Sequence, residues 1–172
     1  NQVLHLKMNE ADESGKVPLA TENQNYFFGR SPEPFIEYQH QENDFDDYAH
    51  QVLLPHKLSQ FGPALAKGDV NNDGLEDVFV GGATGFSAAL FIQIPNGGFK
   101  KANEDFWQGE SGYEDVDALF VDINGDGHQD LFVVSGGNEY SVNDFHYVDR
   151  LYMNDGHGNF KKAAIPNIGR DS

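Results

Sequence analysis

Short apolar runs of about four residues, separated by acidic or glycine-rich segments, dominate the chain from residue 62 onward. Residues 118–121 and 131–134 are examples in which every position is apolar. Continuous runs of this kind are typical of strands covered on both faces, and no helical periodicity extends over a window of about eleven residues. Glycine and asparagine are concentrated at residues 96–98 and 154–159, as in hairpin turns. The pattern predicts an all-β fold.

The same region contains an internal repeat of roughly fifty residues. Residues 69–80 align with residues 122–133 at an offset of 53, and seven of the twelve aligned positions are identical. Residues 90–102 then align with residues 151–163 at an offset of 61, so the second unit is longer by eight residues. A repeat of this length indicates a propeller blade or a solenoid turn. Each unit contains four strand segments, which predicts an antiparallel four-stranded blade.

An acidic loop with the pattern Asp-x-Asn-x-Asp-Gly-x-x-Asp follows the first strand of each unit. Its side-chain oxygens suit Ca²⁺, which takes about six to eight oxygen ligands in uneven geometry, and the glycine lets the seventh position add its carbonyl. An EF-hand is excluded because Val80 and Val133 replace its glutamate at position 12. Without a cation the three carboxylates would repel one another, although the same residues also make good metal-free turns. We predict one structural Ca²⁺ in each loop.

Residues 68–77 and 121–127, together with the turn at 154–160, resemble FG-GAP or VCBS repeats, the calcium-bearing blades of integrin-alpha-type propellers. The likeness covers roughly residues 62–165. It implies five ligands in each loop, with the residue at position 7 binding through its backbone carbonyl. The implied calcium ligands are Asp69, Asn71, Asp73, Leu75, Asp77, Asp122, Asn124, Asp126, His128 and Asp130.

A narrower likeness is to the ASPIC/UnbV group, the cartilage acidic protein-like exported bacterial proteins. Residues 53–66 look like the run that introduces the propeller in that group, and residues 1–6 look like the last strand of the domain before it. This likeness implies an exported, often surface-attached protein that binds glycans or proteins. It also suggests that another part of the same protein precedes the propeller.

These patterns divide the chain into four parts. We expect the end of a preceding domain plus a linker over 1–34, an entry segment with a strand near 35–38 over 35–61, and two repeats over 62–114 and 115–172. A propeller usually has about four to eight blades, so two blades indicate a partial fragment of a larger propeller. Its open sheet edges and uncovered apolar faces predict self-association.

Composition narrows the possible functions of this chain. Its 172 residues carry 28 acidic and 11 basic side chains, a formal charge of −17, and no cysteine. A disulfide framework is thereby excluded, and nucleic acid is an unfavourable partner because its phosphates would be repelled. No apolar run approaches the ~20 residues that a membrane-spanning helix needs, so we expect no membrane insertion by this segment.

The sequence gives little support for catalysis. Carboxylate pairs such as Glu114 and Asp115 could serve glycoside hydrolysis, but neighbours in a strand point to opposite faces. Trp107 is expected to pack between blades rather than to stack on a sugar. We therefore predict a non-catalytic module, and the alternative is the scaffold part of a larger carbohydrate-active enzyme. The expected glycan- or protein-binding surface is the loop 138–147, with its aromatic side chains Tyr140, Phe145, His146 and Tyr147.

Overall fold

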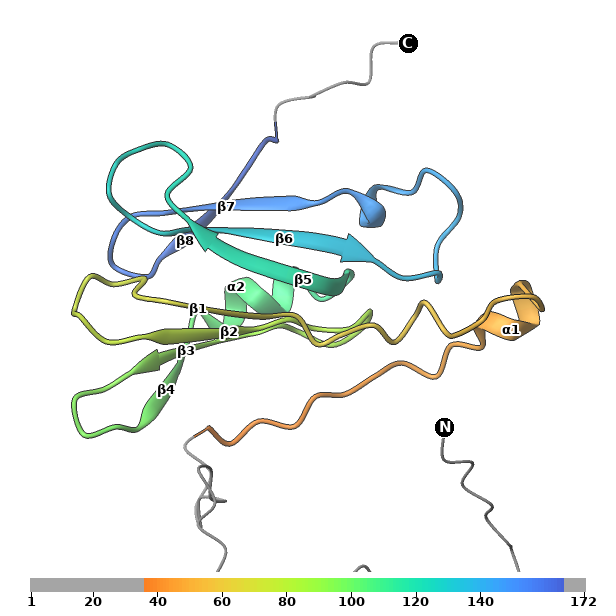
Figure 1. Cartoon of the computed structure of the whole chain (residues 1–172), viewed down its shortest axis with the longest axis horizontal. Helices are drawn as coiled ribbons and strands as arrows, with labels where there is room; N and C mark the ends of the chain where they lie inside the picture. The colour runs from red at the N-terminus through yellow and green to blue at the C-terminus, as the bar shows by residue number, and fades with distance from the viewer. Residues whose placement is uncertain (1–35, 166–172) are drawn as a thin grey trace, which may run out of the picture. The chain divides into compact units, whose positions relative to one another are not determined.

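Two four-stranded antiparallel sheets form the body of the protein (Figure 1). The computed structural model describes residues 36–165, so the preceding domain end and linker predicted before residue 35 lie outside the described residues. The first sheet has strand order β1-β2-β3-β4 and the second has β5-β6-β7-β8. The all-β prediction with two four-stranded blades is confirmed. The strands of the first sheet are β1 (Leu65–Gly68), β2 (Asp77–Val80), β3 (Ala89–Gln93) and β4 (Phe99–Ala102), and those of the second are β5 (Glu114–Val121), β6 (Asp130–Gly136), β7 (Arg150–Asn154) and β8 (Phe160–Ala163).

The pairing register repeats between the two sheets. Leu90 of β3 pairs with Ala102 of β4, and the equivalent Leu151 of β7 pairs with Ala163 of β8. The internal repeat found in the sequence is therefore a repeat of hydrogen-bonded pairs as well as of residue types. The additional residues of the second unit form the long connection between β6 and β7.

The main core lies between the two sheets, with β1 beside β5. Ala66 of β1 faces this core and is only 6% exposed, whereas its repeat counterpart Leu119 of β5 is 58% exposed. The difference arises because the second sheet covers the first on that side, while the corresponding face of the second sheet has no covering element among residues 36–165. The two sheets therefore stack like successive blades and leave one apolar face open.

A short helix fills the space between the sheets. Helix α2 (Glu104–Gly109) follows Asn103, whose left-handed φ of 56° turns the chain out of β4. The helix carries Trp107, which is 1% exposed and packs on Phe79 of β2 and Tyr152 of β7, at ring-centroid distances of 5.1 and 5.4 Å. The expectation that Trp107 packs between blades is confirmed.

The predicted secondary structure lacked two short helices and was wrong at one segment. The predicted order of elements in each unit contained strands and loops only, whereas α2 and the 3₁₀ turn η2 (Phe145–Tyr147) are also present. Both span fewer than two helical turns, so neither can show a helical periodicity. Residues 36–38 of the predicted entry strand are not in a strand. Ile36 and Tyr38 instead pack against a small apolar cluster that includes Val80 and Phe91.

The entry segment, residues 36–61, runs out to helix α1 (Asp47–His50) and back to β1 (Figure 1). Asp47 is fully buried and accepts hydrogen bonds from the Ser59 hydroxyl, from the Leu58 and Ser59 amides, and from the Asn138 side chain. Burial opposes ionisation of Asp47, but these hydrogen bonds outweigh it and lower the pKa of the carboxyl. Asp47 thereby joins the outgoing and returning parts of the entry segment to each other and to the β6–β7 connection.

No helix among the described residues is long and apolar enough to cross a membrane.

Candidate functional site

The two acidic loops lie at one end of the sheets, and the β6–β7 connection and α1 lie at the other (Figure 1). Each acidic loop connects the first two strands of its sheet, as the repeat predicted. The candidate metal loops and the candidate binding loop are therefore separated by the length of the strands.

The first loop is organised by hydrogen bonds from its own backbone amides. The Asp69 carboxylate accepts from the Asp73 and Gly74 amides at 3.1 and 2.8 Å, and Asp73 accepts from the Leu75 amide at 2.8 Å. Gly74 has a φ of +84°, a conformation that side chains at other residues rarely allow. The side chains at positions 3 and 5 are also linked, because the Asn71 side-chain amide donates to the Asp73 carboxylate at 3.0 Å.

The second loop repeats this network. Asp122 accepts from the Asp126 and Gly127 amides at 3.1 and 2.9 Å, and Asp126 accepts from the His128 amide at 2.8 Å. Asn124 donates to Asp126 at 2.8 Å, as its counterpart does in the first loop. These hydrogen bonds lower the pKa of the exposed Asp126 carboxyl, chiefly through the Asn124 side chain. The same Asp, Asn and Gly positions thus build the same hydrogen-bond network twice.

The ninth position of each loop has a second role that the sequence reasoning missed. Asp77 is fully buried and accepts from the Val70 amide at 3.0 Å and from the Gln93 amide of β3 at 2.8 Å. Asp130 likewise accepts from the Ile123 and Asn154 amides. Each carboxylate therefore ties its loop to the neighbouring strand. The sequence contains one sign of this role, because in both repeats the aspartate directly precedes an apolar run.

The donor set of the first loop fits a hard cation. Burial raises the pKa of Asp77, and the nearby charges of Asp73 and Asp69 raise it further. A carboxylate oxygen has two lone pairs, so accepting one amide leaves a position for a cation. Within residues 36–165 no group of three or more His, Cys, Asp or Glu side chains is already gathered as a metal centre. The ligand assignment in both loops stays a prediction.

Leu75 and His128 occupy the predicted carbonyl positions, and the His128 ring also connects the two loops. His128 Nδ1 lies 2.9 Å from Nδ2 of the Asn72 side chain in the first loop. Asn72 Nδ2 also donates to the Gly156 carbonyl at 3.2 Å. The turn between β7 and β8 is thereby joined to both acidic loops. This contact depends on the stacking of the sheets and could not be found from the sequence.

At the opposite end, the β6–β7 connection presents a packed aromatic surface. Tyr140 stacks on His146 with ring centroids 3.9 Å apart, and the Tyr140 hydroxyl donates to the Gly112 carbonyl at 2.9 Å. Phe145 also packs on His146, with ring centroids 3.9 Å apart, and is 63% exposed. Tyr113 lies 6.4 Å from Phe145, ring centroid to ring centroid, and adds to the cluster. The loop predicted to bind a ligand is therefore a packed aromatic platform.

A buried ion pair lies beneath this platform. Arg150 of β7 is 4% exposed and pairs with Asp115 of β5, which is 3% exposed. The guanidinium also donates to the Tyr152 hydroxyl at 3.0 Å and stacks on the Tyr113 ring at 3.9 Å. Burial opposes the charge on Arg150, but the charge of Asp115 outweighs it and raises the pKa of the guanidinium. Since Asp115 also accepts from the Gly82 amide at 2.9 Å, the pair joins both sheets.

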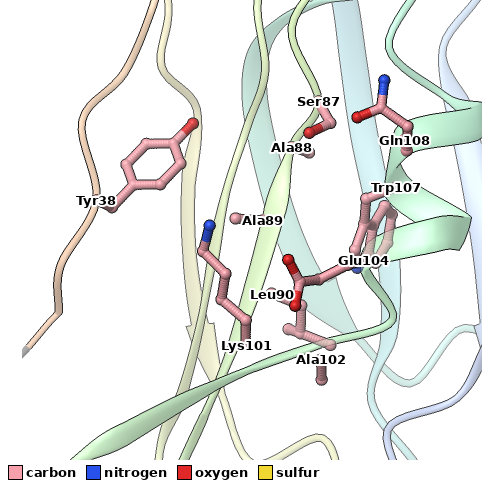
Figure 2. Close-up of a pocket in the computed structure, with 10 residues that line it drawn as sticks. All are labelled: Tyr38, Ser87, Ala88, Ala89, Leu90, Lys101, Ala102, Glu104, Trp107 and Gln108. Atoms are coloured by element: carbon pink, nitrogen blue, oxygen red, sulfur yellow. The ribbon is translucent and has the colours of Figure 1, made fainter.

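A small cavity of about 90 Å³ lies between β3, β4 and α2 (Figure 2). Lys101 and Glu104 project toward it, and Leu90 and Trp107 form part of its wall. The residues that line the cavity include Ser87 but no histidine that could activate it, so the lining gives no indication of a catalytic centre. The residues that line it are Tyr38, Ser87, Ala88, Ala89, Leu90, Lys101, Ala102, Glu104, Trp107 and Gln108.

The repeated loop geometry agrees with a comparison against known families. Residues 69–133 match the family model described as the FG-GAP-like repeat. The match runs from the first aspartate of the first acidic loop to β6, so it includes both loops and supports the resemblance to FG-GAP repeats. No comparison supports the narrower likeness to ASPIC/UnbV proteins. Searches of the curated proteins and of the solved structures returned no match.

Proposed function

We propose that this chain is a non-catalytic, calcium-stabilised FG-GAP-like propeller module of an exported or cell-surface protein, which binds a glycan or a protein through its β6–β7 connection. The observation that carries the proposal is the separation of two features. Two acidic loops with the same side-chain donors lie at one end of the sheets, and a packed aromatic loop lies at the other. The likeness of residues 53–66 to ASPIC/UnbV proteins adds to the case for export.

Calcium would act on the structure of the loops. Asp69, Asn71, Asp73, Asp77 and the Leu75 carbonyl would hold one ion, and their counterparts in the second loop would hold the other. When bound, each ion would offset the repulsion between the carboxylates of its own loop. A ligand that binds only the folded state raises its stability, so calcium would stabilise the blades.

The β6–β7 connection has the properties of a recognition surface. Exposed aromatic rings supply contact area at a small cost in side-chain entropy, and sugars stack on such rings. Tyr147 locks the loop, because its hydroxyl accepts from the Tyr140 amide and donates to the Tyr140 carbonyl, both at 2.8 Å. A loop that is already ordered loses little conformational entropy when a ligand binds.

The open face of the second sheet supports a further part of the proposal, self-association. Leu119 and Ile123 are 58% and 52% exposed on β5 and the loop that follows it. In the first sheet, Ala66, the counterpart of Leu119, is buried against the second sheet. A second copy of the chain would cover this apolar surface in the same manner.

Binding at the aromatic loop is tested with labelled protein on a glycan array, followed by titration with the glycan that gives the strongest response. We expect Phe145→Ala to weaken binding about fivefold or more, because truncation of a ring that is important for binding costs more than about 1 kcal/mol. Ile94→Ala, an exposed apolar residue at the other end, is the matched control and should bind normally. Equal affinity of wild type and Phe145→Ala would overturn the assignment, and hydrolysis of the glycan would favour the enzyme-scaffold alternative.

A further inference from the structure

Glu114, the first residue of β5, is a buried carboxyl group with an incomplete set of hydrogen bonds. Its side chain is 1% exposed. Oε2 accepts from the Thr84 amide at 3.0 Å, whereas Oε1 has no hydrogen-bond partner among the described residues. A buried ionised carboxylate without partners is strongly unfavourable. The arrangement therefore calls for a proton or another positive group at Oε1.

The groups around Glu114 come from three parts of the fold, and most of them are acidic. Glu42 and His40 face it from the entry segment, Glu139 from the β6–β7 connection, and Asp115 from its own strand. The charge of Asp115 is already paired with Arg150. The charged side chains that shift the pKa of Glu114 are all acidic, and no lysine or arginine is among them.

The atoms left without partners are complementary to a proton. His40 Nε2 lies 2.8 Å from Glu42 Oε1, and neither His40 Nδ1 nor Glu42 Oε2 has a partner in the described part of the chain. When Nε2 donates to Glu42, the remaining atoms of both residues are acceptors, as is Oε1 of an ionised Glu114. Protonation of Glu114 supplies the donor that this group of acceptors lacks.

We propose that Glu114 makes the docking of the entry segment onto the two blades proton-linked. With Glu114 protonated, residues 36–61 lie against β5 and the β6–β7 connection. Ionised Glu114 adds a third carboxylate beside Glu42 and Glu139 and releases the segment. The hydrogen bond from Asn43 to Glu139, 2.7 Å long, is one of the contacts that release would break. The same segment contacts Asn138 of the aromatic loop through Asp47, so release would also remove this contact with the proposed binding surface.

The sign of the effect follows from the pKa of Glu114. Burial, with smaller contributions from Glu42, Glu139 and Asp115, raises the pKa of Glu114 from 4.5 to about 8. The docked state therefore holds a proton that the released state gives up, so docking is complete below about pH 4.5. It weakens as pH rises to about 8, and above that value both states are ionised and the dependence ends.

Hydrogen exchange of the amides in residues 40–61, corrected for the intrinsic pH dependence, measures the docking equilibrium. In wild type we expect protection to fall by up to about tenfold per pH unit between roughly pH 5.5 and 7.5, and to level off above about 8. Glu114→Gln keeps the shape and a donor, so its protection should be nearly independent of pH. Glu104→Gln, an exposed glutamate, is the control and should behave as wild type.

His40 faces the same group and could also produce a pH dependence. His40→Asn distinguishes the two residues, because it should keep the wild-type slope if Glu114 is the titrating group. Glu42→Gln removes one neighbouring charge and should end the dependence at a lower pH; this variant tests the proposal even if Glu114→Gln does not fold. A flat wild-type profile, or a slope that persists in Glu114→Gln and disappears in His40→Asn, would overturn the proposal.

Discussion

Trp107→Ala is expected to lower the free energy of unfolding by about 3–5 kcal/mol. The indole is 1% exposed and touches Phe79, Tyr152 and Phe160, with ring centroids 5.1, 5.4 and 5.8 Å away. These rings come from both sheets, so truncation leaves a cavity in the main contact between the blades. Since a domain is typically stable by only about 5–15 kcal/mol, this substitution alone would remove a large fraction of that stability.

Urea denaturation followed by circular dichroism measures this loss. Phe145→Ala is the matched control, because it removes an aromatic ring that is 63% exposed and should change stability by less than about 1 kcal/mol. Trp107→Phe should fall between the two. A loss for Trp107→Ala as small as that for Phe145→Ala would contradict the packing of the two sheets around α2.

Arg150→Met should cost a similar amount, about 3–5 kcal/mol at neutral pH. It leaves the 3% exposed Asp115 carboxylate without its counter-charge and removes the donor to the Tyr152 hydroxyl. The control is Lys67→Met, which breaks an ion pair of 2.7 Å with Glu76 in which both side chains are 62% exposed. Exposed pairs contribute about 0–1 kcal/mol, so this control should be nearly neutral.

A double variant separates the loss of the charge from the loss of packing. Asp115→Asn combined with Arg150→Met removes the uncompensated charge while keeping an acceptor for the Gly82 amide. We expect the double variant to be more stable than Arg150→Met alone in the same urea titration. If the two variants are equally stable, the buried pair does not join the sheets in the way described.

The strands could be predicted from the sequence because local patterns define them. Residues 118–121 and 131–134 are apolar runs bounded by an acidic loop, and they form parts of β5 and β6. The repeat then transfers each assignment from one sheet to the other. The packing of Trp107 could also be predicted, because a large apolar ring in a repeat protein is most often buried between neighbouring repeats.

Other features depend on contacts between distant residues, and no local pattern contains them. Glu114 and Asp115 are neighbours in the sequence, yet Glu114 lies near the carboxylates of Glu42 and Glu139 whereas Asp115 pairs with Arg150, because successive residues of a strand point to opposite faces. The contact of Asp47 with Asn138 spans 91 residues. Helix α2 was missed because six residues are too few to show helical periodicity.

The central claim is that each acidic loop holds one structural calcium ion. Isothermal titration of the EDTA-treated protein tests it most directly, and we predict two Ca²⁺ ions per chain. Asp73→Ala should reduce the number to one, and Asp73→Ala combined with Asp126→Ala should abolish binding. The exposed pair Asp105→Ala and Asp117→Ala should leave it at two. Absence of binding at millimolar calcium, or two ions still bound by the folded Asp73→Ala and Asp126→Ala variant, would contradict the account.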